Sequence, residues 1–434
     1  MPHPSRPESA APAADTLEVE RLVAGGEGLA RRTDGRVVFV SRAAPGERVE
    51  VAYTEWRREW ARARVTSVLA PSPERREPPC PHYATCGGCQ LQHLAYDAQR
   101  AAKAAIVADA LRRVGGVEAA PPEVVAAPHE FGYRNRLSFV LRRRGGHLVA
   151  GFHAHGAPAQ VHDIDACPLA EAPLARAWAS LRGAWGPRAA RLPDGPELRL
   201  TLRATADGRV GLAVEHGRGR GAPEALLETV TGLASVWGID GAGRVRWQAG
   251  EPTLAERWGA AEIPLAGLAF VQVNREAAAA LDAHVGAVCG EAKPGRAVDA
   301  YCGFGLRSLA LARAGVETVG IDVDAHAIAW ANDRAADEDL PARFQAARVE
   351  RALVTALPND LVVLNPPRAG VSREVAVALV RRPAGRVVYV SCNPATLGRD
   401  VRALSERYAL VSCRAFDLFP QTAHVETVAV LERR

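Results

Sequence analysis

Lysine is almost absent from this sequence of 434 residues. It occurs only at positions 103 and 293, so 52 of the 54 basic residues are arginine. The planar guanidinium group suits the recognition of phosphates and bases, although a genome rich in G and C also encodes arginine in place of lysine. Because the net charge is only +5, the composition permits a nucleic-acid partner without demonstrating one.

Long apolar runs are also missing, and none approaches the roughly 18 residues that a membrane-spanning helix requires. Residues 1–15 are rich in proline and alanine and lack the layout of a signal peptide, so we expect a disordered tail. These absences predict a soluble cytoplasmic protein without a membrane partner. In that compartment the eight cysteines are expected to be reduced, metal-bound or catalytic rather than paired in disulfides. The length predicts two or three domains.

The first predicted domain is a small β barrel over residues 16–72. Alternating apolar residues, interrupted by turns, indicate short strands over residues 17–23, 36–40, 47–52 and 60–68. Exposed arginine and aromatic side chains on such strands fit an oligonucleotide-binding barrel, although a barrel with a solvated basic face can serve many functions. The pattern resembles the TRAM domain, a small RNA-binding module.

Cysteines then cluster after a proline-rich linker over residues 71–79. Cys80, Cys86 and Cys89 have the spacing C-x5-C-x2-C, and Cys167 is a plausible fourth ligand after a long excursion. Four cysteines in a reduced compartment indicate zinc or an iron–sulfur cluster. A proline follows the first and the last of them, and a typical zinc ribbon would have two C-x2-C pairs. The spacing therefore favours a [4Fe–4S] cluster over zinc or unliganded thiols.

The middle of the chain combines one helix with several short strands. An alanine-rich helix is predicted over residues 96–114. Strands are predicted over residues 136–141, 148–152, 197–203 and 209–214, and we interpret them as one antiparallel sheet. Residues 131–136, Phe-Gly-Tyr-Arg-Asn-Arg, mix aromatic and basic side chains. They predict either an RNA-facing edge or an ordinary exposed start of a strand.

From about residue 268 strands and helices alternate, which predicts a doubly wound α/β sheet whose last two strands pair as a hairpin. The chain lacks the full G-x-G-x-x-G fingerprint and a P-loop lysine, which argues against a dinucleotide or triphosphate site. A glycine turn at Gly303, followed by Asp322 at the tip of the next strand, suits an adenosine whose ribose hydroxyls need a carboxylate. This is the layout of S-adenosylmethionine (SAM) methyltransferases, with a generic nucleotide-binding domain as the alternative.

Cys392 lies between a β-branched strand over residues 386–390 and an amphipathic run that extends to residue 407. We expect it at the C-terminal tip of a buried strand, where open α/β sheets bind their ligands. The positive partial charge of the following helix N-terminus would favour its thiolate. For an isolated cysteine, a small buried apolar side chain would be the simpler interpretation.

Four motifs resemble the signatures of the RNA uracil-5 methyltransferase family. They are Asp-Ala-Tyr-Cys-Gly-Phe-Gly at 299–305, Asn-Pro-Pro-Arg-Ala-Gly at 365–370, Ser-Cys-Asn-Pro-Ala-Thr at 391–396 and Phe-Pro-Gln-Thr-Ala-His-Val-Glu at 419–426. In addition, Phe-Val-Gln-Val-Asn at 270–274 is similar to the segment that leads into the family's SAM site. The resemblance covers residues 16–432 and includes the members that carry a TRAM domain and an iron–sulfur cluster.

The resemblance implies roles for individual residues. Cys392 would be the nucleophile and Glu426 the base. Positions at the cofactor or active site would be Gln272, Tyr301, Gly303, Asp322 and Asn365, and the [4Fe–4S] ligands would be Cys80, Cys86, Cys89 and Cys167. A thiolate that adds to C6 of uracil makes C5 nucleophilic toward the SAM methyl group, and a carboxylate must then remove the C5 proton. The partner would be RNA, ribosomal rather than transfer RNA, and we expect a monomer.

The domain organisation follows from these patterns and from the resemblance. We expect a tail over residues 1–15, a TRAM-like barrel over 16–72, a central iron–sulfur and RNA-binding domain over 73–91 and 128–267, a helical segment over 92–127 that packs on the catalytic domain, and a SAM-dependent methyltransferase domain over 268–434. The fold class is therefore α/β in the C-terminal domain, preceded by an OB-like barrel and an antiparallel β domain.

Three positions depart from the family pattern. Asn365 stands where an aspartate usually precedes Pro-Pro-Arg, Leu306 follows the glycine turn in place of a polar residue, and Arg348 aligns where an acidic or amide residue would approach the adenine. These changes bear on SAM binding or on the orientation of uracil. Two alternatives follow: an amino-group nucleic-acid methyltransferase that uses Asn-Pro-Pro, or a weakly active or inactive RNA-binding paralogue.

Overall fold

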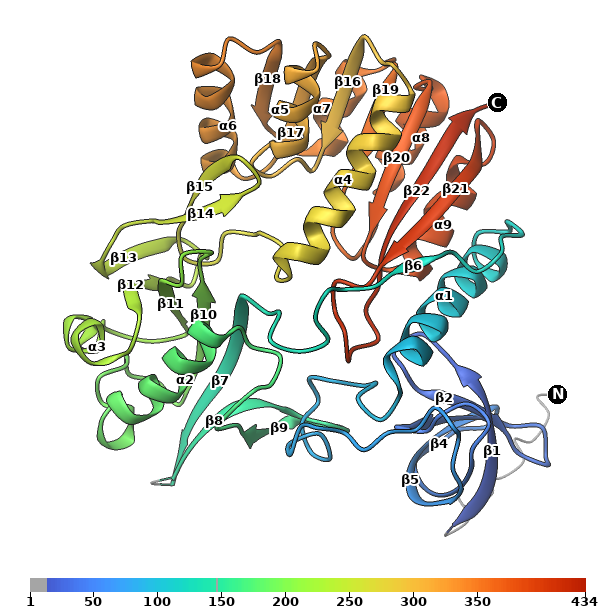
Figure 1. Ribbon diagram of the computed structural model, residues 1–434, viewed down its shortest axis with the longest axis vertical. Helices are drawn as coiled ribbons and strands as arrows, with labels where there is room; N and C mark the ends of the chain where they lie inside the picture. The colour runs from blue at the N-terminus through green and yellow to red at the C-terminus, as the bar shows by residue number, and fades with distance from the viewer. Residues whose placement is uncertain (1–13, 146) are drawn as a thin grey trace, which may run out of the picture.

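The computed structural model describes residues 14–145 and 147–434. Most of the predicted tail, residues 1–13, lies outside this description, and the first strand already begins at Asp15. The described chain forms a barrel, a central domain with a large sheet and a C-terminal α/β domain (Figure 1). No helix in these two ranges is long and apolar enough to cross a membrane.

Five strands close into the N-terminal barrel in the order β1-β2-β3-β5-β4. They are β1 (Asp15–Leu22), β2 (Gly28–Arg31), β3 (Val37–Ser41), β4 (Arg48–Trp56) and β5 (Trp60–Ala70). Alternation along the strands turns Leu17, Val19, Val49 and Val51 inward, where each side chain is at most 3% exposed. The barrel therefore lies where the sequence predicted it, and four of its strands were predicted. Strand β2 was not, because its first residues belong to a glycine-rich stretch that reads as a turn.

A seven-stranded sheet with the order β13-β12-β11-β10-β7-β8-β9 forms the central domain. Its strands are β7 (Arg136–Arg144), β8 (His147–Ala154), β9 (Ala157–Asp163), β10 (Glu197–Ala204), β11 (Val210–Glu215), β12 (Leu233–Ile239) and β13 (Val245–Gly250), and its helical elements are α2 (Ala172–Ala184), η1 (Pro187–Ala189) and α3 (Pro223–Thr229). The four predicted strands, which correspond to β7, β8, β10 and β11, pair antiparallel as expected. The sheet continues past them with a strand that was not predicted, β12, and there the direction changes. Strands β11 and β12 run parallel, because α3 lies in the connection that carries the chain back across the sheet.

The segment over residues 131–136 lies at a contact between the central and the C-terminal domain, which the sequence did not suggest. Tyr133 is 4% exposed, and its hydroxyl donates a hydrogen bond to the Pro420 carbonyl at 3.0 Å. The guanidinium of Arg134 lies over the rings of Tyr133 and Phe419. These aromatic and basic side chains therefore join the central domain to the C-terminal domain, a role that local composition does not indicate.

The C-terminal domain contains an eight-stranded sheet with the order β18-β17-β16-β19-β20-β22-β21-β6. Its strands are β16 (Arg296–Ala300), β17 (Glu317–Asp322), β18 (Ala342–Ala346), β19 (Leu361–Leu364), β20 (Arg386–Ser391), β21 (Tyr408–Phe416), β22 (Glu426–Arg433) and β6 (Val124–Val125). Its helices are α4 (Arg275–Glu291), α5 (Leu306–Arg313), α6 (Ala325–Asp337), α7 (Val349–Ala356), α8 (Arg373–Arg381) and α9 (Pro394–Leu404). A small two-stranded sheet, β14 (Leu254–Trp258) and β15 (Ala261–Leu265), precedes the domain.

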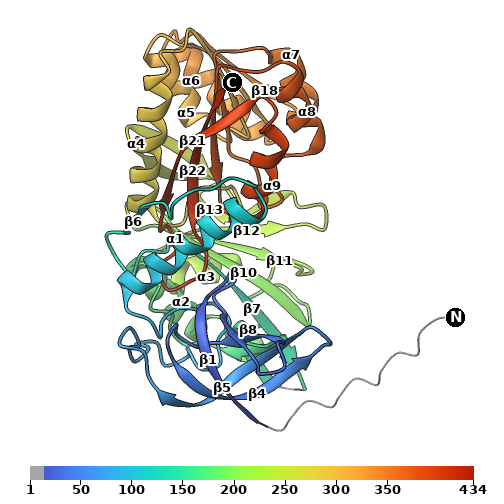
Figure 2. The same ribbon diagram turned by 90° about the vertical axis from the view of Figure 1, so that its right-hand side faces the viewer.

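Helices cover both faces of this sheet, as the doubly wound prediction requires. Figure 2 shows α4, α5 and α6 on one face and α7, α8 and α9 on the other. The central strand β19 is consequently apolar throughout, and its four residues are fully buried. The predicted C-terminal hairpin is present, since β21 and β22 pair antiparallel.

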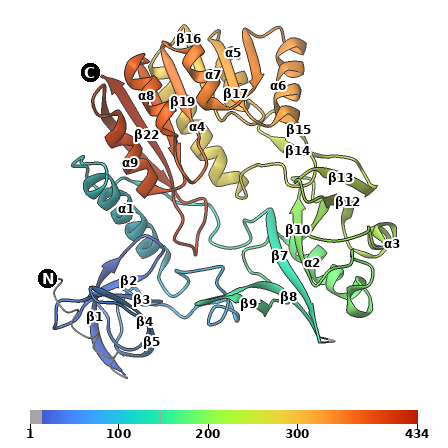
Figure 3. The ribbon, with the colours of Figure 1, turned by 180° about the vertical axis from the view of Figure 1, so that it is seen from behind.

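Helix α1 (Tyr96–Arg113) belongs to the N-terminal half but packs on α9 of the C-terminal domain, as expected (Figure 3). Only glycine permits this close approach, because a Cβ atom at Gly398 would lie 2.6 Å from the Ala110 carbonyl oxygen. After α1, strand β6 lies parallel to β21 at the edge of the sheet. Sequence analysis did not predict β6, since two residues carry no periodicity.

Candidate active site

The two residues proposed for catalysis meet at the carboxyl edge of the C-terminal sheet. Cys392 directly follows β20, and Glu426 is the first residue of β22. Because Ser391 pairs with Thr427 in the antiparallel register, the next position places Cys392 opposite Glu426. The Thr427 hydroxyl donates a hydrogen bond to the Ser391 carbonyl at 3.1 Å and fixes this arrangement. Two motifs far apart in sequence thus occupy neighbouring strand ends.

The Cys392 thiol is only partly exposed, and its environment differs from the expected one. Burial raises its pKa, the neighbouring Glu426 carboxylate raises it further, and Arg368 opposes both effects. The helix N-terminus after it was expected to favour the thiolate. However, the Asn393 side chain accepts the hydrogen bond from the Ala395 amide at 3.1 Å. Burial and Glu426 therefore oppose the effect that was expected from the helix terminus, and Arg368 supplies positive charge beside the sulfur.

Glu426 is a buried carboxyl group with a strongly shifted proton affinity. It is 4% exposed, and burial raises its pKa to about 7. The positive charges of Arg307 and Arg368 act in the opposite direction but do not cancel the effect of burial. A carboxyl group that exchanges its proton near neutral pH has the proton affinity that a general base requires.

Arg368 is a site residue that sequence analysis did not assign. Its carbonyl accepts hydrogen bonds from Asn393 Nδ2 and from Thr396 Oγ1, both at 3.3 Å. These bonds tie the Asn-Pro-Pro-Arg loop to the start of α9 and hold the guanidinium beside Cys392. Its Nη2 also lies 3.5 Å from His424 Nε2. The sequence feature that could have identified Arg368 is its position in the Asn-Pro-Pro-Arg motif, where a permanently charged side chain follows the end of a strand.

Gly303 and Asp322 form a compact turn at the same sheet edge. The Gly303 amide donates a hydrogen bond to Asp322 Oδ2 at 2.8 Å, and the Asp324 amide donates to Oδ1 at 2.9 Å. Gly305 ends the turn at a φ of 65°, where a Cβ atom would lie 2.2 Å from the ring of Phe344. Glycine at 305 therefore lets the turn pack against Phe344, while the backbone amides of the turn hold the Asp322 carboxylate at the sheet edge, where a ribose could be bound.

Tyr301 and Asn365 follow the neighbouring strands β16 and β19. Tyr301 has a φ of 64°. Together with Glu350 and residues of α8 and α9, it lines a cavity of about 1030 Å³. The Asn365 amide donates a hydrogen bond to the Ala300 carbonyl at 3.2 Å. Both residues thus lie at the edge that carries Gly303, and Tyr301 also lines the cavity beside α8 and α9.

The remaining predicted positions surround this edge. Gln272 is half-buried in the segment before α4, and its carbonyl accepts a hydrogen bond from Asn135 Nδ2 at 3.0 Å. Leu306 packs against an apolar cluster that includes Val271, which accounts for an apolar residue where the family carries a polar one. Arg348 is exposed at the start of α7.

The four cysteines predicted to bind a cluster converge on one cavity of about 300 Å³. Its lining includes Cys80, Cys86, Cys89 and Cys167 together with Arg134. Burial raises the pKa of the Cys89 thiol to about 12 and that of Cys167 to about 11. Across residues 14–145 and 147–434, no three His, Cys, Asp or Glu side chains are arranged to hold a metal ion. The four thiols therefore line one cavity without forming a preformed metal site among the described residues.

Comparisons with known proteins cover almost the whole chain. The tRNA (Uracil-5-)-methyltransferase family model matches residues 266–434, and the TRAM domain model matches residues 16–66. The 23S rRNA (uracil(1939)-C(5))-methyltransferase RlmD of Pseudomonas entomophila is 35% identical, over 96% of this chain and 93% of that protein. The RlmD of Methylococcus capsulatus is 34% identical, over 96% of both chains.

A solved structure agrees with these matches. The Pyrococcus abyssi tRNA (uracil-54, C5)-methyltransferase in complex with S-adenosyl-L-homocysteine superposes with a TM-score of 0.74 and 26% sequence identity. The match covers 96% of this chain and 100% of that one. With a TRAM barrel, a SAM-dependent methyltransferase fold and full-length relatives above 30% identity, the chain belongs to the RNA uracil-C5 methyltransferase family.

Proposed function

We propose that the protein transfers a methyl group from SAM to C5 of a uridine in RNA and so forms 5-methyluridine. The observation that carries the proposal is the placement of Cys392 opposite Glu426 at one strand edge, in a chain of this family. A thiol and a carboxyl group are the two groups that methylation of uracil C5 needs, since C5 is otherwise a poor nucleophile.

Each group acts in a separate half of the reaction. The Cys392 sulfur adds to C6 of a uracil that has been extruded from its stack, and C5 then takes the methyl group of SAM. Glu426 removes the C5 proton, after which the C6–S bond breaks and the double bond returns. Gly303, Asp322 and the neighbouring Asn365 would hold SAM at the adjacent strand ends.

Arg368 favours this function over the amino-group alternative. Amino-group methyltransferases that use Asn-Pro-Pro normally place an aromatic residue next, to stack on the base, and they need no cysteine nucleophile. Here the next residue is Arg368, whose positive charge acts on both Cys392 and Glu426. The loop therefore supports a thiol-and-carboxylate site instead of an amine-binding one.

Ribosomal RNA is the substrate class that the comparisons support best. Four relatives that act on 23S rRNA by name are 32–35% identical across almost the full chain, whereas the archaeal tRNA enzyme is 26% identical. In this proposal the barrel and the central domain bind the RNA, residues 268–434 carry out the chemistry, and a single copy of the chain suffices.

The direct test is to map 5-methyluridine in ribosomal and transfer RNA from cells with and without the gene. We expect one 5-methyluridine in 23S rRNA to disappear and to return when the purified enzyme and SAM are added to the unmodified RNA. Loss from transfer RNA alone would overturn the assignment of the substrate class. RNA binding without any methyl transfer would instead support the RNA-binding paralogue.

The four converging cysteines are proposed to bind a [4Fe–4S] cluster. Four thiols that line one cavity are the donor set of such a cluster, and Cys80, Cys86 and Cys89 have the spacing C-x5-C-x2-C. When bound, the cluster would brace the turn that holds these cysteines, since the methyl transfer requires no electron.

Anaerobic purification should give a brown protein with about four iron and four sulfide ions per chain. Changing Cys89 to serine is expected to remove the colour and most of the iron, because one thiolate ligand is lost. Cys413 lies on β21 outside the cavity, so Cys413→Ser serves as the control and should keep both. One zinc per chain and no iron would contradict the cluster.

A further inference from the structure

One of the two lysines in the chain is completely buried. Lys103 of α1 is 0% exposed, and its Nζ donates hydrogen bonds to Asp417 Oδ1 at 2.6 Å and to the Phe419 carbonyl at 3.1 Å. Asp417 is also fully buried. An isolated buried ion pair is weak support for stability, because desolvation of both charges offsets their attraction. A positional role explains the pair better than stability does.

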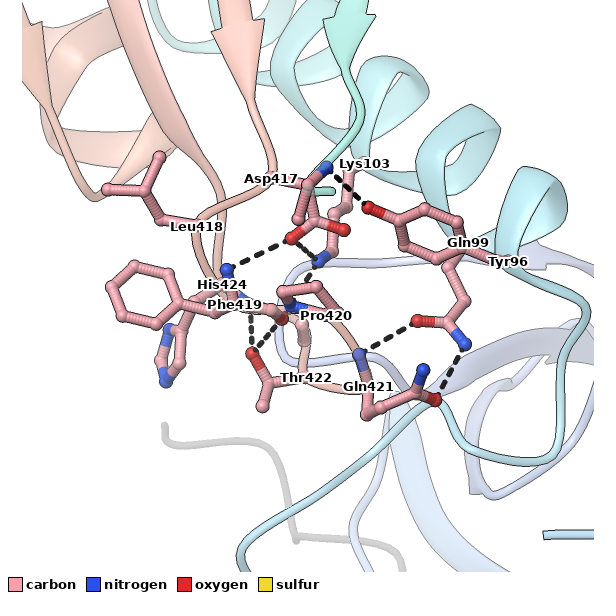
Figure 4. Close-up of polar contacts among 12 residues, drawn as sticks. Tyr96, Gln99, Lys103, Asp417, Leu418, Phe419, Pro420, Gln421, Thr422 and His424 are labelled. Atoms are coloured by element: carbon pink, nitrogen blue, oxygen red, sulfur yellow. Dashed lines mark hydrogen bonds and ion pairs between the residues drawn. The ribbon is translucent and has the colours of Figure 1, made fainter. Parts of the chain in front are cut away.

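Asp417 begins the loop over residues 417–425 that joins β21 to β22, which we call the base loop (Figure 4). Phe416, the last residue of β21, pairs across the hairpin with Glu426. The buried ion pair therefore fixes the chain one residue away from the position that faces the proposed base. Asn274, at the start of α4, adds a hydrogen bond from Nδ2 to the Leu418 carbonyl at 3.3 Å.

Gln99, one turn before Lys103 on the same helix, holds the middle of the base loop. Its Oε1 accepts a hydrogen bond from the Gln421 amide, and its Nε2 donates to Gln421 Oε1, both at 2.9 Å. Gln421 is buried and has a φ of 71°, a backbone conformation that needs such support. Figure 4 shows Gln99 and Lys103 approaching the loop from the same helix.

The segment that carries the predicted cluster ligand Cys89 also contacts the base loop. The amides of Gln90 and Leu91 donate hydrogen bonds to the Gln421 carbonyl at 3.1 Å and 3.0 Å. Gln90 directly follows Cys89. Segments from outside residues 268–434 thus contact the base loop at its start and in its middle.

We propose that Lys103 and Gln99 are positioning residues for Glu426, which set its carboxylate for removal of the C5 proton. The inference rests on the proposed function. In the step concerned, Glu426 takes the proton from C5, the electron pair of that C–H bond forms the C5–C6 double bond, and the electron pair of the C6–S bond returns to the Cys392 sulfur. Methyl transfer precedes this step and requires Cys392 but not Glu426. A displaced base loop therefore slows release of the product and not formation of the methylated adduct.

The test follows both halves of the reaction in one assay. RNA carrying tritium at uridine C5 and SAM with a ¹⁴C-labelled methyl group report proton loss and methyl transfer separately, and denaturing gels show the covalent adduct. The Lys103→Met/Asp417→Asn double variant removes both charges, so that neither is left buried alone. Gln99→Leu removes two hydrogen bonds from the loop without touching a charge, and it tests the proposal even if the double variant fails to fold.

For both variants we expect the ratio of tritium release to methyl transfer in the first turnover to fall at least about tenfold, with accumulation of methylated adduct. Arg113→Met is the matched control, because this exposed residue lies on the same helix, pairs with Asp109 and does not contact the loop; its ratio should match wild type. An unchanged ratio in folded variants, or equal loss of both signals, would overturn the positioning role. Failure of the wild type both to transfer the methyl group and to release tritium would refute the proposed function instead.

Discussion

Replacing Cys392 with alanine is expected to lower kcat for uridine methylation by at least about 10⁴-fold and to abolish the covalent complex with RNA. Without the sulfur there is no addition to C6, so C5 stays a poor nucleophile and the methyl group is not transferred. Binding of SAM should change little, because the turn of Gly303 and Asp322 lies on other strands of the sheet.

Two measurements check this expectation. Transfer of labelled methyl groups gives kcat, and RNA with 5-fluorouridine at the target position traps the complex, because fluorine at C5 cannot be removed as a proton. Cys413→Ala is the matched control, since this half-buried cysteine on β21 lies outside the site, and its activity should stay within about twofold of wild type. A Cys392→Ala variant that still methylates uridine would exclude the mechanism.

The Glu426→Gln variant should stop the reaction at its second half. Methyl transfer to the adduct is expected to proceed, whereas turnover falls about 10³-fold, because the amide cannot accept the C5 proton. Stable methylated protein–RNA complexes should therefore accumulate on denaturing gels. If Glu426→Gln turned over at the wild-type rate without such complexes, another group would be the base.

The same variant has a predictable effect on stability. The folded pKa of about 7 lies above the ordinary value of 4.5, so the folded state holds the proton more tightly than the unfolded one. Stability contributed by the neutral carboxyl is complete below pH 4.5 and is lost as the pH rises to about 7. Glu426→Gln should remove this loss, so that above pH 7 its free energy of unfolding exceeds that of wild type by about 3 kcal/mol.

Unfolding midpoints at pH 5 and pH 8 provide the measurement. The gap between Glu426→Gln and wild type should widen toward pH 8. Glu432→Gln, on the same strand but paired with Arg386 at the surface, should show no such widening. A gap that stays constant with pH would contradict the raised pKa of Glu426.

The raised pKa of Glu426 also explains how two acidic groups share one site. A carboxylate next to a thiolate is unfavourable, and each raises the pKa of the other when both are charged. While the sulfur is the attacking anion, a protonated Glu426 avoids this repulsion. Once the sulfur is bonded to carbon it is neutral, and the carboxylate form becomes accessible for removal of the proton.

The parts predicted from sequence are those in which neighbouring residues carry the information. Strand ends with Gly303, Asp322, Asn365 and Cys392 lie at one sheet edge, because parallel strands share their direction. The barrel and the C-terminal hairpin followed from alternation in the same way.

The parts that sequence analysis missed depend on partners far along the chain. Lys103 and Asp417 are 314 positions apart, and nothing near either residue indicates the other. The aromatic and basic residues at 131–136 suggested RNA contact or an exposed strand start, but Tyr133 among them is buried against Pro420 in the C-terminal domain. The parallel pairing of β11 and β12 depended on the path of a connection, which strand periodicity does not contain.

Strand β6 makes the two halves of the molecule difficult to separate. Because Val124 and Val125 pair with Ala415 and Phe416, the end of β21 next to the site is covered by a segment synthesised long before the strand it protects. A fragment restricted to residues 266–434 would leave the main-chain N–H and C=O groups at this end of β21 bare as well, so that the whole edge could pair with other copies of itself. Such a fragment should aggregate, whereas one that keeps residues 96–125 retains its natural cover.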